Sequence, residues 1–559
     1  MYRKWDFMNV FGIGGCIGCI AFIYIYGVKI LNVQYDAWLL VGGDLTQQYL
    51  GWCFYRNSDC LFPFGLTTEL TYPYPISIVY ADPIPLLAVF FKLLSPILPT
   101  PFQYHGLWGL VCFLLQGGFS AIFLYRYVNN KLMCGFLSLF FICSSIVFQR
   151  MYGHTPLASH WIIIVALCCL VYWEKFIGKK KSIFIWGGLG VISVCVHAYF
   201  VPITFLILLC YSYNIWVKGE NVKFVIYTVS LYLICVFTSM YLLGALQTGF
   251  GMMAGDGLGH YSSNLNSLFN ARGYSKILSG LPIKDGQNEG EAYLGAGMLI
   301  VSMLAMILAI YNFNTTKGKI IVNKTYRHYF FSVLVLMVTF FFLAVAPKIA
   351  FGNNVILNFI YPQFIEKILS LFRATGRFMF PVLYMIMLFS IAIIVNKINR
   401  KLAYSFLFIC LMIQMYDFSG LMQGRHSYYK NPVTPSILLK GEHDFGEIIK
   451  SYNHIIFVNH DQVLKKTDLG LAIAYYAQKN QIPISAFYLA RMPEALLNQD
   501  EARYIKKLQE GNVSEEDLFV FLKEDDVKER YQINLYHISG FFIGSKNPID
   551  GLKKYNANK

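Results

Sequence analysis

Residues 183–217 have the sequence IFIWGGLGVISVCVHAYFVPITFLILLCYSYNIWV, a stretch of 35 residues without Asp, Glu, Lys or Arg. One membrane-crossing helix takes about 20 apolar residues, so this stretch is too long for one span and fits a hairpin of two. We place the turn at His197-Ala-Tyr199. The stretch therefore predicts two antiparallel membrane helices within an integral membrane protein.

The composition extends this conclusion to the whole chain. Of its 559 residues, 56% are hydrophobic and 14% are charged. Soluble domains carry about 45–50% apolar and about 25% charged residues, so a soluble protein is excluded. The formal net charge of +15 would otherwise suggest a nucleic-acid binder. Here the cations lie in short clusters between apolar runs, as in cytoplasmic loops, and we expect no nucleic-acid partner.

Apolar runs of membrane length recur over the first three quarters of the chain and predict about eleven α-helical spans. They lie at about 9–31, 104–125, 132–149, 160–174, 183–199, 200–217, 223–246, 293–311, 328–346, 378–396 and 402–417. Lys and Arg cluster in alternate loops, which places the N-terminus in the cytoplasm and the C-terminus outside. The first apolar stretch has no small-residue cleavage site, so we expect an uncleaved anchor.

The outer loops of this topology are long. They span residues 32–103, 247–292 and 347–377. Within the first loop, Ile84–Leu98 is periodic but only about 15 residues long, which predicts an interfacial or re-entrant helix. The composition becomes polar near Gly424. We therefore predict a transmembrane domain over residues 1–425 and a small extracytoplasmic α/β domain over residues 426–559.

Alternating strands and helices are expected in the C-terminal domain. The strands are His454–Val458, Ile484–Leu489 and Leu518–Leu522, and the helices are Leu469–Lys479 and about Glu501–Glu510. Such alternation is typical of a small α/β domain. The sequence of this domain has no convincing Gly-rich phosphate loop, so we expect a structural or acceptor-facing role for it.

Thirteen cysteines would indicate a disulfide framework in a small secreted protein. Eleven of them lie inside apolar segments, where Cys acts as a small hydrophobic residue. Only Cys53 and Cys60 lie in a polar loop. At these two positions a disulfide and two free thiols both remain open.

Two acidic residues of the first outer loop are candidate functional residues. Asp44 follows Gly42-Gly43 and is either a general base, beside a backbone that can approach a ligand closely, or the cap of a helix over Leu45–Tyr55. Asp82 precedes Pro83-Ile-Pro85 and is either a ligand contact or the N-cap of a helix that proline begins.

Basic side chains form a second group of candidates. Arg373 and Arg377 are spaced i,i+4 and would share one helix face, where paired guanidiniums suit a phosphate or anchor the chain at the interface. Arg150, His154 and His160 border the third and fourth spans. The two histidines are poorly spaced for a metal site, so we expect them to hydrogen-bond a sugar or phosphate.

Two carboxylates, Glu289 and Glu291, flank Gly290 ahead of the eighth span. They are either substrate contacts or ordinary surface charges. No predicted span carries the series of ionisable residues that marks a proton-coupled pump. Polar groups that gather outside the bilayer suit a substrate with a lipid tail in the membrane and a polar head outside.

Several stretches together resemble the GT-C glycosyltransferases, and more specifically an uncharacterised family of bacterial membrane proteins in that superfamily. They are GGDLTQQYLGW (42–52), FPFG (62–65), YADPIPL (80–86), FQYHGLW (102–108), RMYGH (150–154), GQNEGEAYLG (286–295) and FRATGRF (372–378). These stretches cover nearly the whole predicted membrane domain. They are more specific to the family than to an activity.

The resemblance implies an inverting transfer of a sugar from a polyprenyl-phosphate donor to a cell-envelope polymer or lipid. The reaction would take place on the outer face of a bacterial plasma membrane, with membrane lipids as further partners. Asp44 would be the base, and Arg373 and Arg377 would hold the lipid phosphate. The sugar pocket would contain Asp82, His154 and Glu289.

One departure from the metal-dependent relatives bears on cofactors. No DxD or ExD motif occurs between the third and fourth spans. We therefore expect no cofactor, and a divalent metal stays possible but unsupported. Two other classes also remain open, a transporter or flippase of lipid-linked sugars and a non-catalytic protein that binds envelope polymer. A flippase needs polar groups along a path through the spans, whereas this chain keeps them on one side.

Overall fold

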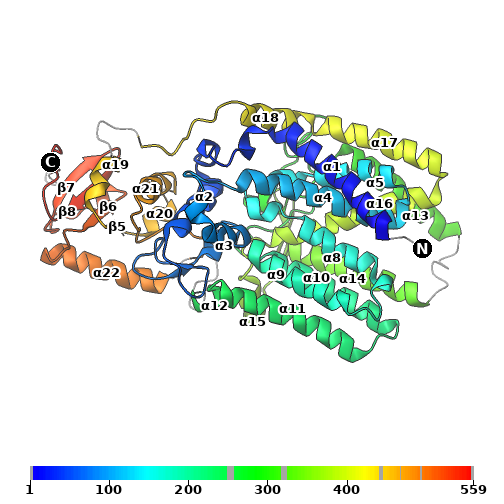
Figure 1. Cartoon of the computed structure of the whole chain (residues 1–559). Helices are drawn as coiled ribbons and strands as arrows, with labels where there is room; N and C mark the ends of the chain where they lie inside the picture. The colour runs from blue at the N-terminus through cyan, green and yellow to red at the C-terminus, as the bar shows by residue number, and fades with distance from the viewer. Residues whose placement is uncertain are drawn as a thin grey trace. The chain divides into compact units, whose positions relative to one another are not determined.

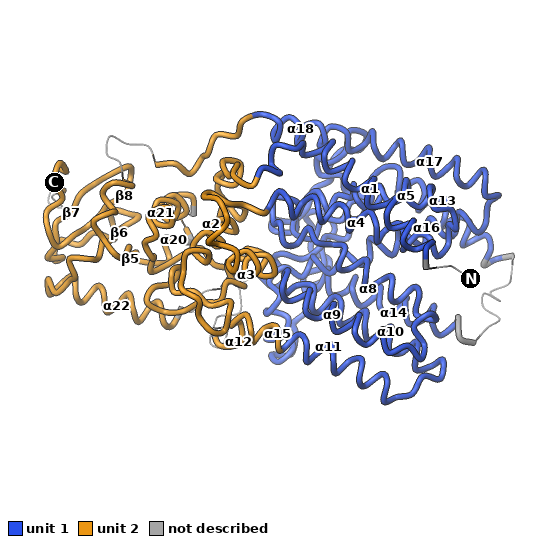
Figure 2. The backbone as a smooth tube through the Cα atoms, viewed as in Figure 1, with its two compact units in different colours: residues 1–32, 105–237, 254–431 blue, residues 33–104, 238–253, 432–559 orange. Residues whose placement is uncertain are grey.

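The computed structural model describes residues 4–248, 257–315, 324–439, 445–465, 467–491 and 494–555. The chain forms two compact units, each assembled from three separate stretches (Figure 2). Unit 1 comprises residues 1–32, 105–237 and 254–431, and unit 2 comprises residues 33–104, 238–253 and 432–559. The predicted boundary between a membrane domain and a C-terminal domain at residue 425 stays a prediction.

Unit 1 is a bundle of helices (Figure 1). Its helices are α1 (Lys4–Tyr26), α4 (His105–Val128), α5 (Lys131–Leu137), α6 (Leu139–Ile142), α7 (Ser145–Arg150), α8 (Trp161–Val171), α9 (Lys181–Val196), α10 (Phe200–Val217), α11 (Val222–Leu242), α13 (Ala296–Thr315), α14 (Lys324–Val345), α15 (Gln363–Leu369), α16 (Met379–Lys397), α17 (Arg400–Asp417) and α18 (Ser419–Lys430). The last five residues of α11 belong to unit 2. The predicted hairpin is confirmed, because α9 and α10 are separated only by His197–Tyr199.

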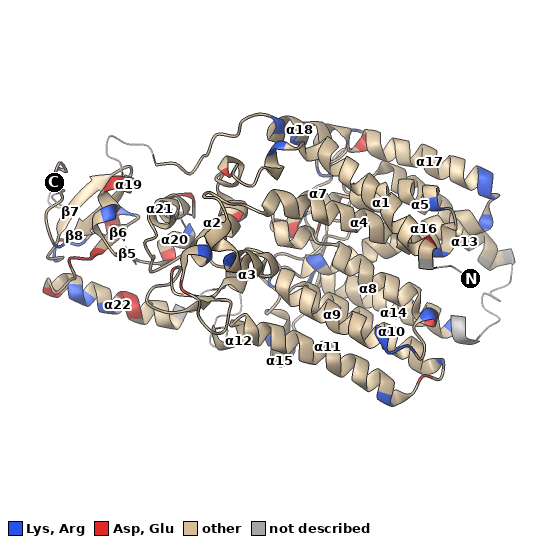
Figure 3. Cartoon of the chain, viewed as in Figure 1, with Lys and Arg blue, Asp and Glu red and all other residues tan. Residues whose placement is uncertain are grey.

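Several of these helices are suited to a bilayer. Among the described residues, six helices are long and apolar enough to cross a membrane, and α17 with α18, bent by 50°, makes a seventh if the pair is one span. Four shorter apolar helices accompany them. Figure 3 shows Lys and Arg mostly near the ends of the helices in unit 1. The structure thus supports a helical membrane protein, and the count of eleven spans stays a prediction.

Two predicted spans differ from the observed helices. The span predicted at 9–31 ends earlier, because α1 stops at Tyr26 and Gly27 adopts φ +72°. The span predicted at 132–149 is broken into α5, α6 and α7. Hydroxyls of Ser138 and Ser144 donate to the carbonyls of Gly135 (2.6 Å) and Phe141 (3.1 Å) at the two breaks. Such side-chain bonds compete with the bonds of a continuous helix.

Close backbone contact joins α1 to α4. A Cβ atom on Gly14 would lie 2.4 Å from the carbonyl oxygen of Gly117, and one on Gly18 would lie 2.1 Å from that of Phe113. Small residues allow helix backbones to approach this closely in membrane proteins. Gly14 and Gly18 are therefore packing residues of the bundle.

Unit 2 contains a mixed β-sheet. Its helices are α2 (Gly43–Asn57), α3 (Pro85–Leu93), α12 (Ala245–Thr248), α19 (Phe445–Ile448), α20 (Asp461–Lys465), α21 (Thr467–Lys479) and α22 (Glu494–Glu510). Its strands are β1 (Leu66–Thr67), β2 (Ile76–Ser77), β5 (His454–Val458), β6 (Asp517–Phe521), β7 (Asn534–Ile538) and β8 (Phe541–Ser545). The sheet has the order β5-β6-β8-β7, with β5 and β6 parallel and the other pairs antiparallel.

The predicted strands of the C-terminal domain are partly wrong. The structure confirms β5 and β6, but Ile484–Leu489 is not a strand, since only Ile484 pairs, in an isolated bridge to Ile455. The hairpin β7–β8 was not predicted. Its turn has Ser539 at φ +46° and Gly540 at φ +85°, the left-handed pair that two-residue hairpins prefer.

Residues 69–72 are bonded beside this sheet within unit 2. Ile484 donates its N–H to the carbonyl of Glu69 (3.0 Å), and Tyr72 donates its N–H to the carbonyl of Ile484 (2.9 Å). The rings of Tyr72 and His454 stack with centroids 4.0 Å apart. Residues 69–72 are therefore hydrogen-bonded to Ile484, which itself bridges to Ile455 of β5.

Two further details concern the loops. The loop 347–377 of unit 1 contains the hairpin β3 (Lys348–Phe351) and β4 (Asn354–Asn358). The short helix predicted near Ile84–Leu98 is observed as α3, with Phe90 and Leu93 exposed, and its contact with a membrane stays a prediction. Cys53 and Cys60 are both free thiols.

Candidate functional site

Two of the motif stretches, 286–295 and 372–378, pack against each other in unit 1. Gly376 donates its N–H to the carbonyl of Tyr261 (3.0 Å). A Cβ atom on Gly376 would lie 2.4 Å from the Cα of Gly290, and one on Gly290 would lie 2.3 Å from Oγ of Ser263. Ser263 Oγ also donates to the carbonyl of Gly290 (2.7 Å). Both motifs thus need glycine where their backbones meet.

This packing brings three charged residues together, which we name the arginine clamp: Arg150, Glu289 and Arg377. Arg150 Nη1 donates to Oε2 of Glu289 (2.9 Å) and Arg150 Nη2 donates to its backbone carbonyl (2.7 Å). Arg377 donates to the same Oε2 from Nε (3.2 Å) and Nη2 (3.0 Å). Two guanidiniums therefore converge on one carboxylate oxygen.

The arginine clamp carries a surplus of positive charge. Two arginines face one carboxylate, and the arginines are only 3% and 9% exposed. Burial alone would raise the pKa of Glu289, but Arg150 and Arg377 outweigh it and hold that pKa at about 2. Among the described residues, Nε of Arg150 is buried without a hydrogen-bond partner. The clamp thus favours a further anion.

Glu291 lies two residues after Glu289 but in a different electrostatic state. It is 5% exposed, and its Oε2 lies 3.6 Å from Nη1 of Arg272. Burial raises the pKa of Glu291 to about 8, against the lowering effect of Arg272 and Arg150. Its Oε1 is buried and has no hydrogen-bond partner within the described ranges. The surroundings therefore shift the pKa values of two carboxylates on one short segment in opposite directions.

Arg373 and Arg377 do not share a helix face, so that prediction is wrong. The helix α15 ends at Leu369, and Arg377 lies in a short 3-10 turn, Thr375–Phe378. Arg373 is exposed and lies 4.8 Å above the ring of Tyr261, donating to its hydroxyl (2.9 Å). Arg377 lies 4.4 Å from the centre of the Tyr199 ring. The N–H of Ala374 donates to the Tyr199 hydroxyl (2.7 Å), which holds the segment away from a helical path.

The two candidate histidines occupy different surroundings. His154 is placed with its ring centroid 5.2 Å from that of His197, and burial, Arg377 and Arg150 hold its pKa well below the usual range. His160 is fully buried, with Nδ1 2.8 Å from the Tyr384 hydroxyl and its ring against Phe380. His160 therefore packs in the bundle interior, and a substrate contact there stays a prediction.

Asp44 and Asp82 lie in unit 2, and neither is the N-cap of its helix. Gly42, at φ +88°, is the N-cap of α2, and Asp44 lies in its first turn. The N–H of Gly42 donates to Oγ1 of Thr46 (2.8 Å). Ile84 precedes α3, so the capping interpretations of both carboxylates are wrong.

Backbone strain marks the neighbourhood of Asp82. Asp82 and Ile84 adopt φ +53° and +58°, although neither is glycine. For a β-branched residue such as Ile84 this conformation is a genuine outlier. Such strain persists only where the surrounding structure enforces it, and it gathers at functional sites. A role for Asp82 stays a proposal supported by this geometry.

Sequence reasoning missed the aromatic and basic residues that support the arginine clamp. Tyr199 and Tyr261 underlie the two arginines of the motif 372–378, and no local pattern distinguishes them from other interfacial tyrosines. Arg425 of α18 donates to the carbonyls of Phe148 and Met151, which flank the turn at Arg150. Its partners lie more than 270 positions away in the chain, so local sequence could not reveal them.

Comparison with known proteins adds a family and a set of distant structures. A family model described as "Domain of unknown function (DUF6311)" matches residues 15–419, and one described as "DUF6311 C-terminal domain" matches residues 444–546. No curated protein sequence matches the chain.

Solved structures of an oligosaccharyltransferase from Archaeoglobus fulgidus are similar at 10% sequence identity. The apo form gives a TM-score of 0.39 over 87% of this chain and 65% of that one. The form tethered to an acceptor peptide gives 0.40 over 87% and 64%. The complex of AglB with an inhibitory peptide and a dolichol-phosphate gives 0.40 over 99% and 75%. The chain thus spans less than two thirds of the length of the first two.

Proposed function

The chain belongs to the DUF6311 family, and we propose that it is a GT-C-type membrane glycosyltransferase that uses a polyprenyl-phosphate sugar as donor. The observation that carries the proposal is the arginine clamp. Two buried guanidiniums meet on one oxygen of Glu289, and their summed charge exceeds that of the carboxylate.

The charge of the clamp suits a phosphate leaving group. Guanidiniums bind phosphate through paired, charge-assisted hydrogen bonds, which are stronger than neutral ones. In the donor, the phosphate gains negative charge as its bond to the sugar breaks. Arg377 is anchored by Glu289 and Tyr199, whereas the exposed Arg373 is held only by Tyr261 among the described residues. We assign Arg373 and Arg377 to the phosphate, with Arg150 fixing Glu289 in place.

The reaction that we propose is an inverting displacement. Asp44 takes the proton of an acceptor hydroxyl, and the oxygen attacks the anomeric carbon opposite the phosphate. The bond from that carbon to the phosphate oxygen breaks, and its electron pair leaves with the lipid phosphate, whose charge the arginines stabilise. Asp82, His154 and Glu289 are proposed to contact the sugar. The acceptor is a cell-envelope polymer or lipid.

Donor binding tests the phosphate assignment. The purified protein in lipid nanodiscs would be titrated with a panel of radiolabelled polyprenyl-phosphate hexoses, as wild type, Arg373→Ala and Arg377→Ala. We expect each substitution to weaken binding about tenfold or more, because hydrogen bonds to a charged group contribute about 1.5–3 kcal/mol. Lys276→Ala is the matched control, since this exposed lysine belongs to the same unit and its ammonium lies 5.7 Å from the Tyr416 ring, away from the arginines' partners. Equal binding by all four proteins would contradict the assignment of the phosphate site to Arg373 and Arg377.

A further inference from the structure

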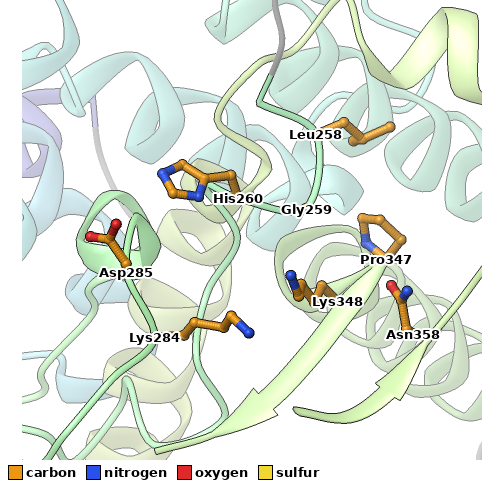
Figure 4. A pocket seen from close by; sticks show the side chains of 8 residues that line it. All are labelled: Leu258, Gly259, His260, Lys284, Asp285, Pro347, Lys348 and Asn358. Atoms are coloured by element: carbon orange, nitrogen blue, oxygen red, sulfur yellow. The ribbon is translucent and has the colours of Figure 1, made fainter. Parts of the chain in front are cut away.

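Unit 1 contains a second basic site. A hollow of about 240 Å³ is lined by Leu258, Gly259, His260, Lys284, Asp285, Pro347, Lys348 and Asn358. Three separate segments build it: the loop at 258–260, residues 284–285, and the hairpin β3–β4, whose register pairs Lys348 with Asn358. Figure 4 shows Lys284 and Lys348 extending into the space between the loop and the hairpin.

The charge of this hollow is not balanced by its own residues. Two lysines face one carboxylate, and no ion pair involves Lys284 or Lys348 in the part of the chain that the structure describes. The Oδ1 of Asp285 accepts from the N–H of Gly286 (3.1 Å), and this single carboxylate offsets only one of the two lysine charges. Paired ammonium groups at the mouth of a concave site attract a small anion, and phosphate is the anion that lysine commonly binds as a point charge.

One loop supplies a residue to the hollow and a residue to the proposed phosphate site. His260 lines it, and the next residue, Tyr261, contacts Arg373 through its ring and its hydroxyl. The imidazole of His260 also lies against Gly286, where a Cβ atom would approach its Nε2 to 2.4 Å, so the motif 286–295 forms part of the wall. One short loop therefore separates Arg373 from the two lysines.

The neutral and acidic groups of the hollow suit a ligand in which hydroxyl groups accompany the phosphate. The Asn358 amide, the His260 imidazole and Asp285 can exchange hydrogen bonds with hydroxyl groups. The volume of about 240 Å³ leaves room for a phosphate together with further atoms.

We propose that this hollow is a second phosphate subsite, so that the substrates of the enzyme carry two phosphate groups between them. The inference rests on the proposed function, in which Arg373 and Arg377 bind the first phosphate. The second phosphate comes either from a lipid diphosphate donor or from a phosphate-bearing acceptor. Lys284 and Lys348 bind it, and the loop 258–261 sets the distance between the two phosphates.

Binding of short prenyl phosphates tests the subsite without any transfer reaction. The full-length protein in nanodiscs would be titrated with farnesyl monophosphate, farnesyl diphosphate and glycerol phosphate oligomers. If the second phosphate belongs to the donor, wild type binds the diphosphate about tenfold or more tightly than the monophosphate, and Lys284→Gln with Lys348→Gln abolishes this preference. If it belongs to the acceptor, the oligomers bind and the same double substitution removes their binding.

The controls separate this proposal from the proposed function. Lys276→Gln and Lys367→Gln remove one exposed lysine each outside the hollow, and this pair should behave as wild type. Loss of farnesyl monophosphate binding in Arg373→Ala supports the first phosphate site. If the two lysine substitutions leave monophosphate binding unchanged and weaken only the binding that depends on the second phosphate, the second site is supported as well. If the lysine substitutions change neither the diphosphate preference nor oligomer binding, the second subsite is wrong, whatever the arginine variants do.

Discussion

At the scale of single residues, Arg150, Glu289 and Arg377 of the arginine clamp form a largely buried ion network. Removing one member of a buried, hydrogen-bonded charge group costs about 3–5 kcal/mol, because the remaining charges lose their compensation. The Glu289 side chain is 23% exposed, so we expect the low end of that range. Glu289→Gln should therefore lower the melting temperature of the protein in detergent. Glu366→Gln, at an exposed position of α15, is the control and should leave it unchanged. An unchanged melting temperature in Glu289→Gln would mean that the network carries no stability.

Glu291 gives a prediction that depends on pH. Its pKa in the folded state, about 8, lies above the ordinary value of 4.5, so the folded protein holds this proton more tightly than the unfolded chain. The associated stability is complete below about pH 4.5 and is lost as the pH rises through about 8, at about 1.4 kcal/mol for each unit of pKa difference.

Glu291→Gln keeps a neutral side chain at every pH, so the variant does not lose this stability as the pH rises. The melting temperature of the variant should therefore rise relative to wild type between pH 5 and pH 8, and the difference should level off above pH 9. Circular dichroism or a thiol-reactive dye can follow the transition. A difference that does not vary with pH would show that Glu291 is already ionised in the fold.

The residues of the clamp could be named from the sequence, but their pairing could not. Arg150, Glu289 and Arg377 each lie in a separate motif. The pairs are 139 and 88 positions apart in the chain, and only the tertiary packing of the 286–295 and 372–378 segments brings them together. The i,i+4 spacing of Arg373 and Arg377 suggested a helix, but α15 ends at Leu369 and Arg377 lies in a separate 3-10 turn.

At the scale of elements, the contact between Gly290 and Gly376 holds two motif segments together. Gly376→Ala places a methyl group 2.4 Å from a backbone atom, so the segments must separate. Overpacking of this kind costs about 1–3 kcal/mol. We expect a lower melting temperature and weaker donor binding, since Arg377 would shift with the segment. Gly424→Ala in α18 is the control, because nothing lies within 4 Å of its Cβ position and alanine favours helix. Equal donor binding by the two variants would contradict the proposed role of this contact.

The sequence predicted helices and strands correctly where the hydrophobic pattern alone determines the type of element. The hairpin of α9 and α10 and the strands β5 and β6 are buried runs whose length and flanks identify them. The segment Ile484–Leu489 has the same pattern, but it pairs at Ile484 only. The hairpin β7–β8 has a turn signal at Ser539-Gly540 that could have identified it. The breaks between α5, α6 and α7 depend on serine bonds that hydropathy does not detect.

At the scale of the whole molecule, the chain divides between a helical unit and a unit that combines residues 33–104 with the C-terminal sheet. Hydropathy could predict the helical class, because bilayer-length apolar runs permit few alternatives. It could not predict that residues 69–72 bond to Ile484, because backbone pairing across 400 residues leaves no local pattern. Asp44 thus belongs to the same unit as the C-terminal domain, with Gly42 packed against Asp468 of α21.

We propose above all that the protein transfers a sugar from a lipid phosphate with Asp44 as the base. The most direct measurement incubates the nanodisc-embedded protein with radiolabelled polyprenyl-phosphate sugars and a crude envelope fraction, comparing wild type, Asp44→Asn and Asp59→Asn. Asp59 is an exposed carboxylate of the same loop and serves as the matched control. We expect label in the acceptor fraction for wild type and Asp59→Asn, and a loss of about a hundredfold or more for Asp44→Asn, since general base catalysis contributes about 10²–10⁴. Full transfer by Asp44→Asn would contradict the assignment of Asp44 as the base. If wild type binds the donors but transfers none of the sugars, the proposal that the protein is a glycosyltransferase is contradicted.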